Sequence, residues 1–166
     1  MSANVFAYGS NMCSGQLRSY EVRPEGPGRP AMLRDYQLRF NKKSDDGSGK
    51  ANVEPHTDAD VWGVLYTIPE EDLKVLDRGE VGYRREQMPV HISDVALPDA
   101  WVFVARKPSA DPLLRPYSWY TRFLIEGARE HGLPAEYVEQ LQRIEANQDE
   151  DQERDRRKRS LICRAE

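Results

Sequence analysis

The stretch Val5-Phe6-Ala7-Tyr8-Gly9-Ser10-Asn11-Met12 is the strongest structural signal in this chain, because a short apolar run stops there at a turn. The run predicts a strand, and the residues after it favour tight turns. Glycine lets a ligand approach the backbone closely, and the N–H groups of such a turn can bind an anion. Gly9, Ser10 and Asn11 are therefore a candidate anion-binding loop, although many junctions of this composition are only turns.

The composition is that of one globular domain. The chain has 166 residues, of which 39% are hydrophobic and 31% charged, and its formal net charge is −4. A nucleic-acid-binding protein would normally carry a clustered basic excess, so we expect no nucleic-acid partner. No apolar run approaches the roughly 20 residues of a membrane span, and the first residues do not resemble a signal peptide. We therefore expect a cytoplasmic protein with no membrane partner.

Cysteine usage fits a reducing compartment. Cys13 and Cys163 lie near opposite ends of the chain, without the spacing of a metal site and without a nearby histidine. The sequence therefore predicts no metal centre.

The pattern along the chain predicts an α+β domain. Strands fill the first two-thirds and helices the last third, without the regular βαβ alternation of a doubly wound sheet. About six strands are predicted from β-rich runs between turn-rich segments. These runs are Val5–Tyr8, Ala31–Leu33, Tyr36–Phe40, Val61–Ile68, Gln87–Ile92 and Trp101–Ala105.

Three helices are predicted. A short one lies between Ile68 and Val81, with Leu73 and Leu76 facing inward, since Pro69 suits a first helical position. Apolar residues at helical spacing predict a longer one over Tyr117–His131 and another after Pro134. We expect these last two to pack as a pair over the sheet.

Three segments occur in an order and spacing that few families share. They are Tyr8–Asn11, then Val61–Tyr66 followed by Leu73–Glu80, then Gly127–Tyr137. Together they resemble the γ-glutamylcyclotransferase family over roughly residues 4 to 147. The resemblance implies a single domain over residues 1–148, with a mixed, mostly antiparallel sheet closed into a small barrel-like core and helices outside.

The reaction implied by the resemblance releases 5-oxoproline from a γ-glutamyl amide. The α-amine of the glutamyl group attacks its own γ-carbonyl and expels the amine attached there, so no cofactor or external nucleophile is needed. An α-amino group has a pKa of about 8 and is mostly protonated at neutral pH. A base must therefore remove a proton before attack, and an acid must return one to the leaving amine.

Glu80 is the candidate for both proton transfers. It stands where the family's Leu-Asp-x-x-Glu pattern, here beginning Leu76-Asp77, carries its acid–base glutamate. Gly79 and Gly82 predict a tight bend that points the side chain into a cavity, where burial would raise its pKa. Many family members have Gly directly after the glutamate, whereas this chain has Val81, so the geometry of the following loop is open.

The remaining candidates bind the substrate. Gly9, Ser10 and Asn11 would donate hydrogen bonds to the developing oxyanion or to the glutamyl α-carboxylate. Tyr8 would be a wall or a hydrogen-bond donor of the pocket.

Two candidates come from later in the chain. Tyr120 ends Pro116-Tyr117-Ser118-Trp119-Tyr120, which resembles the family's Pro-Ser-x-x-Tyr, and is a second candidate wall or donor. Arg106 stands where some members place a substrate-binding tyrosine, and it is a candidate to bind a carboxylate instead.

Alternatives remain open. Ser10 as a nucleophile is disfavoured, because it lacks a Gly-x-Ser-x-Gly elbow and no histidine stands in a triad context. Glu54 and Glu86 are the next candidates for the base. A non-catalytic small-ligand binding or regulatory domain on the same fold is the alternative function. The sequence leaves open the identity of the leaving amine and whether the protein is a monomer or a homodimer.

Residues 149–166 form a charged C-terminal extension. Its first eleven residues, Asp149–Arg159, contain five acidic and five basic side chains and no apolar one. Such a segment is predicted to be a frayed helix or disordered, and its deletion is predicted to leave folding and turnover nearly unchanged.

Overall fold

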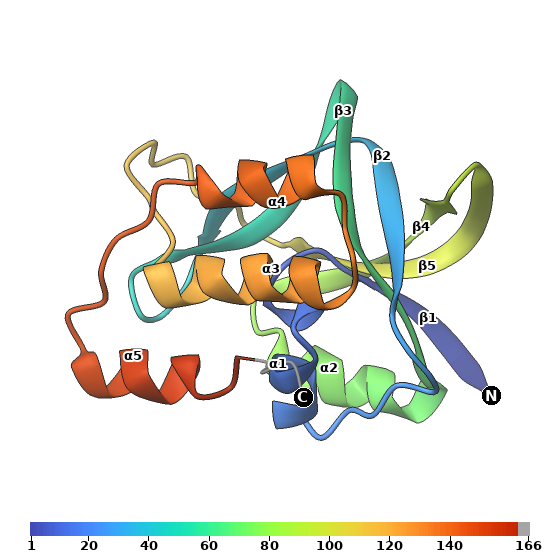
Figure 1. Ribbon diagram of the computed structural model, residues 1–166, viewed down its shortest axis with the longest axis horizontal. Helices are drawn as coiled ribbons and strands as arrows, with labels where there is room; N and C mark the ends of the chain where they lie inside the picture. The colour runs from blue at the N-terminus through green and yellow to red at the C-terminus, as the bar shows by residue number, and fades with distance from the viewer. Residues whose placement is uncertain (163–166) are drawn as a thin grey trace.

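Strand β1 (Ser2–Ala7) closes a five-stranded barrel (Figure 1). The computed structural model describes residues 1–162, and Cys163 lies outside them. Around the barrel the strand order is β1-β3-β2-β4-β5. β1 pairs antiparallel with β3 (Gly49–Pro69) and parallel with β5 (Val95–Ala105), whereas the other pairs are antiparallel. The predicted α+β class and the mixed, mostly antiparallel barrel are confirmed.

The long hairpin of β2 (Arg29–Lys43) and β3 corrects the predicted strand count. The runs Ala31–Leu33 and Tyr36–Phe40 belong to one strand, so the described residues contain five strands rather than six. The interruption between the runs is a bulge, because the pairing register shifts between Arg34 and Tyr36 and the intervening residue, Asp35, has a φ of 62°. Strand β4 (Tyr83–Ile92) then pairs with β5.

The predicted helices are present. The short one is η2 (Glu70–Asp72) followed by α2 (Leu73–Gly79), and its Leu73 and Leu76 are buried as expected. The two later helices are α3 (Ser118–Glu130) and α4 (Ala135–Gln142), which pack against each other beside the barrel (Figure 1).

Two short helical elements directly after β1 were not predicted. They are η1 (Ser10–Met12) and α1 (Ser14–Ser19). Their sequence is polar and short, but Met12 and Leu17 are buried and anchor them against the core.

The C-terminal extension differs from a frayed tail in its described part. Helix α5 (Gln152–Arg159) lies beside α3 (Figure 1). Its anchor is a charged residue: the buried Asp149 carboxylate accepts two bonds of 2.7 Å from Arg154 and one of 2.8 Å from the Trp119 indole. This ion pair was not predicted, because Asp149–Arg159 contains no apolar residue that would indicate packing against the domain.

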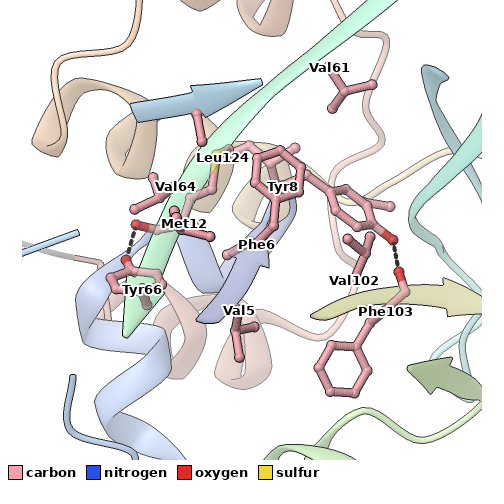
Figure 2. Close-up of a cluster of buried hydrophobic side chains, with 14 of the residues drawn as sticks. Val5, Phe6, Tyr8, Met12, Val61, Val64, Tyr66, Val102, Phe103 and Leu124 are labelled. Carbon is pink, nitrogen blue, oxygen red and sulfur yellow. Dashed lines mark hydrogen bonds between the residues drawn. The ribbon is translucent and has the colours of Figure 1, made fainter. Parts of the chain in front are cut away.

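The core fills the barrel and the space under α3. Figure 2 shows Phe6, Val64 and Leu124 among its buried side chains. In the same view the Tyr66 hydroxyl donates a 2.9 Å hydrogen bond to the Met12 carbonyl. The core therefore holds the turn that follows β1 as well as the strands.

Asp149→Ala should lower the free energy of unfolding by about 3 kcal/mol, because the Trp119 N–H loses its acceptor and the Arg154 guanidinium keeps only its 3.9 Å ion pair with Asp151. Hydrogen bonds from Arg154 lower the pKa of Asp149 to about 2. The stabilisation is therefore present above the ordinary pKa of 3.8 and is lost as the pH falls through about 2.

Denaturant unfolding at several pH values measures this effect. Glu150→Ala, at an exposed neighbouring acid, is the control and should change stability by less than about 0.5 kcal/mol. Equal stability of the two variants at neutral pH would show that the Asp149 anchor contributes nothing.

Candidate active site

A pocket lies where the end of β1, the end of α2 and the first turn of α3 come together. Most of the predicted site residues line it. These predicted residues are Tyr8, Gly9, Ser10, Asn11, Glu80 and Tyr120. The pocket is also lined by residues that were not predicted, among them Ala51, Tyr83 and Phe103. Segments separated by more than 100 residues in the sequence thus contribute to one cavity.

The backbone around Glu80 turns sharply. Glu80 caps α2, and its N–H donates to the Leu76 carbonyl at 2.8 Å. The chain then reverses, because the Tyr83 N–H donates to the Glu80 carbonyl and Gly82 has a φ of 86°. The bend predicted from the flanking glycines is present, and it accommodates Val81 as an exposed residue.

The Glu80 carboxyl is held by Asn11. The Asn11 Nδ2 donates to Glu80 Oε1 at 2.6 Å. Burial raises the pKa of Glu80 above its ordinary value, and it outweighs the Asn11 hydrogen bond and the charge of Lys42, which both lower the pKa. General acid–base catalysis is most efficient when the pKa of the group lies near the working pH, and burial shifts the pKa of Glu80 in that direction.

The loop beside Glu80 presents backbone donors. The N–H groups of Ser10 and Asn11 open the η1 turn, and no residue among 1–162 accepts a hydrogen bond from either. They remain available to an anionic or carbonyl oxygen of a ligand.

Core contacts fix this loop in place. Tyr66 binds the Met12 carbonyl, and α3 approaches so closely that a Cβ on Gly127 would lie 2.5 Å from the Met12 carbonyl carbon. At the other end, a Cβ on Gly9 would lie 3.1 Å from the Tyr120 hydroxyl oxygen. Glycine at both positions permits the close packing of the loop.

Three tyrosines form a fixed wall. The Tyr8 hydroxyl donates to the Phe103 carbonyl, as Figure 2 shows, and the Tyr83 hydroxyl donates to the Ala51 carbonyl at 2.7 Å. The Tyr120 hydroxyl oxygen accepts from the Ala51 N–H at 3.0 Å, and the Ser10 side chain is its second hydrogen-bond partner. Burial raises the pKa of all three phenols, so they stay neutral at working pH.

Arg106 does not line this pocket. It is exposed at the end of β5, where its N–H donates to the Gly82 carbonyl and its Nε donates to the Tyr83 carbonyl at 3.1 Å. Its guanidinium is directed to backbone rather than to the cavity. Arg106 therefore supports the Gly82–Tyr83 turn from outside this pocket, and its binding of a substrate carboxylate stays a prediction.

The alternative bases also lie elsewhere. Glu54 accepts a bond from Asn41, and Glu86 pairs with Arg84 at 2.6 Å. Neither lines the cavity that contains Glu80.

Sequence reasoning missed several residues near the carboxyl group. Tyr83 follows Glu80 at a spacing of three. Gln16 comes from the unpredicted helix α1, and Tyr20 caps the end of that helix. A Cβ on Gly79 would lie 2.9 Å from the Tyr20 ring, which shows how closely α1 packs under the bend. The Gly79-Glu80-x-Gly82-Tyr83 spacing could have identified Tyr83, whereas no local pattern marks Tyr20.

Several known proteins are similar to this chain in sequence and in fold. A model of the AIG2-like family matches residues 60–141. Gamma-glutamylcyclotransferase from Homo sapiens is 29% identical over 157 residues, covering 86% of this chain and 78% of the human protein. The Bos taurus protein of the same name is 26% identical over the same shares. A solved structure described as gamma-glutamyl cyclotransferase superposes with a TM-score of 0.78 at 26% identity, covering 89% of this chain and 90% of that one.

The chain belongs to the AIG2-like/γ-glutamylcyclotransferase family, as a distant member. Its Glu80 and the Tyr8–Asn11 loop stand together in the way expected from the family motifs. In the described part of the chain, no helix has both the length and the apolar character needed to cross a membrane.

Replacement of Glu80 by Gln should stabilise this family member above pH 4.5, the ordinary pKa of the group. A carboxyl whose pKa is raised by folding contributes fully to stability below its unfolded pKa, and the contribution is lost as the pH rises through the folded pKa. The Gln side chain does not ionise, so the Glu80→Gln variant does not lose this stability as the pH rises.

Melting curves measure this difference. At pH 4 the two proteins should melt alike, and at pH 8 Glu80→Gln should melt at the higher temperature. Asp99→Asn, at an exposed carboxylate of β5, is the control and should not reproduce the trend. A Glu80→Gln protein that melts below the wild type at pH 8 would contradict the burial argument.

Proposed function

We propose that this protein is a γ-glutamyl cyclotransferase that acts in the cytoplasm on a small γ-glutamyl amide. The observation that carries the proposal is the Glu80 carboxyl, held 2.6 Å from Asn11 in a pocket with the donors of Ser10 and Asn11. The names of the relatives at 26–29% identity support the reaction class and leave the substrate open.

The proposed reaction is an intramolecular acyl transfer. Glu80 takes a proton from the substrate α-ammonium, and the free amine nitrogen attacks the γ-carbonyl carbon. The backbone N–H groups of Ser10 and Asn11 stabilise the oxyanion that develops. The amide C–N bond then breaks as Glu80 returns its proton to the leaving nitrogen, and the attacking nitrogen releases its second proton to solvent. The products are 5-oxoproline and a free amine.

The enclosed pocket contributes by positioning. A flexible glutamyl chain must fold before its amine can reach its own γ-carbonyl, and holding it folded removes much of the entropic barrier. The rings of Tyr8 and Tyr120 are buried, and each hydroxyl group forms a hydrogen bond with a backbone atom. These two rings therefore supply rigid walls that can hold the glutamyl chain in its folded shape.

Incubation with a panel of γ-glutamyl amides should release 5-oxoproline, detected by mass spectrometry. Acetylation of the substrate α-amine should abolish turnover, because the attacking nitrogen is blocked. Glutamate as the sole product would indicate hydrolysis instead. Absence of any turnover across the panel, with retained binding, would favour a ligand-binding domain on the same fold.

Glu80→Gln should lower kcat about 10² to 10⁴-fold with little change in substrate binding, since the amide keeps the shape but cannot carry a proton. Glu86→Gln is the matched control, because Glu86 lies outside the pocket, and it should retain activity. If the Glu80 variant keeps more than about a third of wild-type kcat, well above the smallest loss expected for general acid–base catalysis, another group is the base.

A further inference from the structure

The pocket continues outward past Glu80 into a second, more polar region of about 210 Å³. Ser10, Glu80, Tyr83 and Tyr120 line both regions, so Glu80 stands at their junction. A substrate with its glutamyl part in the inner region and its scissile amide at Glu80 extends its leaving group into the outer one.

Three lysines from separate elements surround this outer region. Lys42 comes from β2, Lys50 from β3 and Lys158 from α5. Each ammonium lies over an aromatic ring: Lys42 is 5.4 Å from the centre of Tyr83, and Lys158 is 5.3 Å from that of Trp119. Lys50 lies 4.6 Å from the same Trp119 ring. These rings place the three charges at the edge of one cavity.

The lysines are incompletely neutralised. Lys50 forms a 2.9 Å ion pair with Asp46. Among residues 1–162, Lys42 and Lys158 have no carboxylate within 4.0 Å, and the further acids that line this region are Glu80 and the exposed Asp45. Burial lowers the pKa of Lys50 and of Lys158, and the charges of Lys158 and Lys42 lower that of Lys50 further. An anion in the outer region would relieve this repulsion.

We propose that Lys42, Lys50 and Lys158 form an anion subsite that binds a negatively charged group on the leaving amine, with Lys158 of α5 as a specificity-determining residue. The inference rests on the proposed function for the orientation of the substrate. All three lysines lie outside residues 60–141, the part of the chain that the family model matches.

The subsite serves the leaving group rather than the glutamyl α-carboxylate. Asn11 lines the inner region alone and Ser10 lines both regions, whereas Lys42, Lys50 and Lys158 line the outer region alone. Loss of a lysine should therefore affect substrates according to the charge of their leaving amine, and not all γ-glutamyl compounds equally.

A pair of nearly isosteric substrates tests this assignment. γ-Glutamylglycine carries a carboxylate on its leaving amine, and γ-glutamylglycinamide carries a neutral amide in its place. The wild type should favour the glycine compound in kcat/KM. Lys158→Gln should lower the glycine-to-glycinamide ratio about tenfold, a typical effect of losing a hydrogen bond to a charged group, and Lys158→Arg should retain most of the ratio.

Arg156→Gln is the matched control. It removes the same charge from the same helix, but Arg156 is exposed and does not line the outer region, so the ratio should not change. Lys42→Gln repeats the test on another element if α5 detaches in the Lys158 variant. An unchanged ratio, or equal losses on both substrates, would overturn the subsite.

Binding separates this inference from the proposed function. If the wild type turns over neither compound, calorimetric titration with both still tests the lysines. Tighter binding of the glycine compound that is lost in Lys158→Gln would support the subsite although the proposed reaction had failed. Equal or absent binding of the two compounds would overturn it.

Discussion

Closure of the barrel by β1 is the constraint on which the candidate site depends. β1 joins β3 on one side and β5 on the other, so its end has one fixed position relative to the rest of the sheet. That end carries the Tyr8–Asn11 loop to α2, where Asn11 reaches Glu80. The loop is held in this position at Met12, whose carbonyl accepts a hydrogen bond from Tyr66 and whose backbone packs closely against Gly127 of α3.

The site combines fixed geometry with an unfavourable charge environment. The hydroxyls of Tyr8 and Tyr83 are bound to backbone carbonyls, so the walls do not need to reorganise around a ligand. Burial makes ionisation of Glu80 costly in the same place. Such a carboxyl reduces stability at neutral pH and gains the ability to exchange protons there, a common compromise at functional sites.

The sequence predicted the class of the fold and most of the pocket. Glu80, Tyr8, Tyr120 and the Gly9–Asn11 loop were identified because they belong to local motifs, and they meet in the structure. Strand limits were less predictable, since the bulge at Asp35 separates two runs of one continuous strand. The position of Arg106 outside this pocket could not be predicted, because its place after β5 does not determine which carbonyl groups its side chain contacts.

The features that sequence reasoning missed depend on contacts between distant segments. In the sequence, Asp149 and Arg154 have the pattern of surface charges. In the fold, Trp119 and α3 bury the aspartate. Lys158 likewise becomes part of a pocket only through the packing of α5 beside α3. The hydrophobic periodicity or motif of one segment does not indicate which distant segment it will contact.

The most direct test of the account is a ¹³C NMR titration of the Glu80 side-chain carboxyl, assigned by comparison with Glu80→Gln. The account predicts a pKa above the ordinary value of 4.5, because burial opposes ionisation. A pKa at or below 4.5 would contradict it, since the carboxylate would then be a weak proton acceptor and the pocket would lack its proposed base.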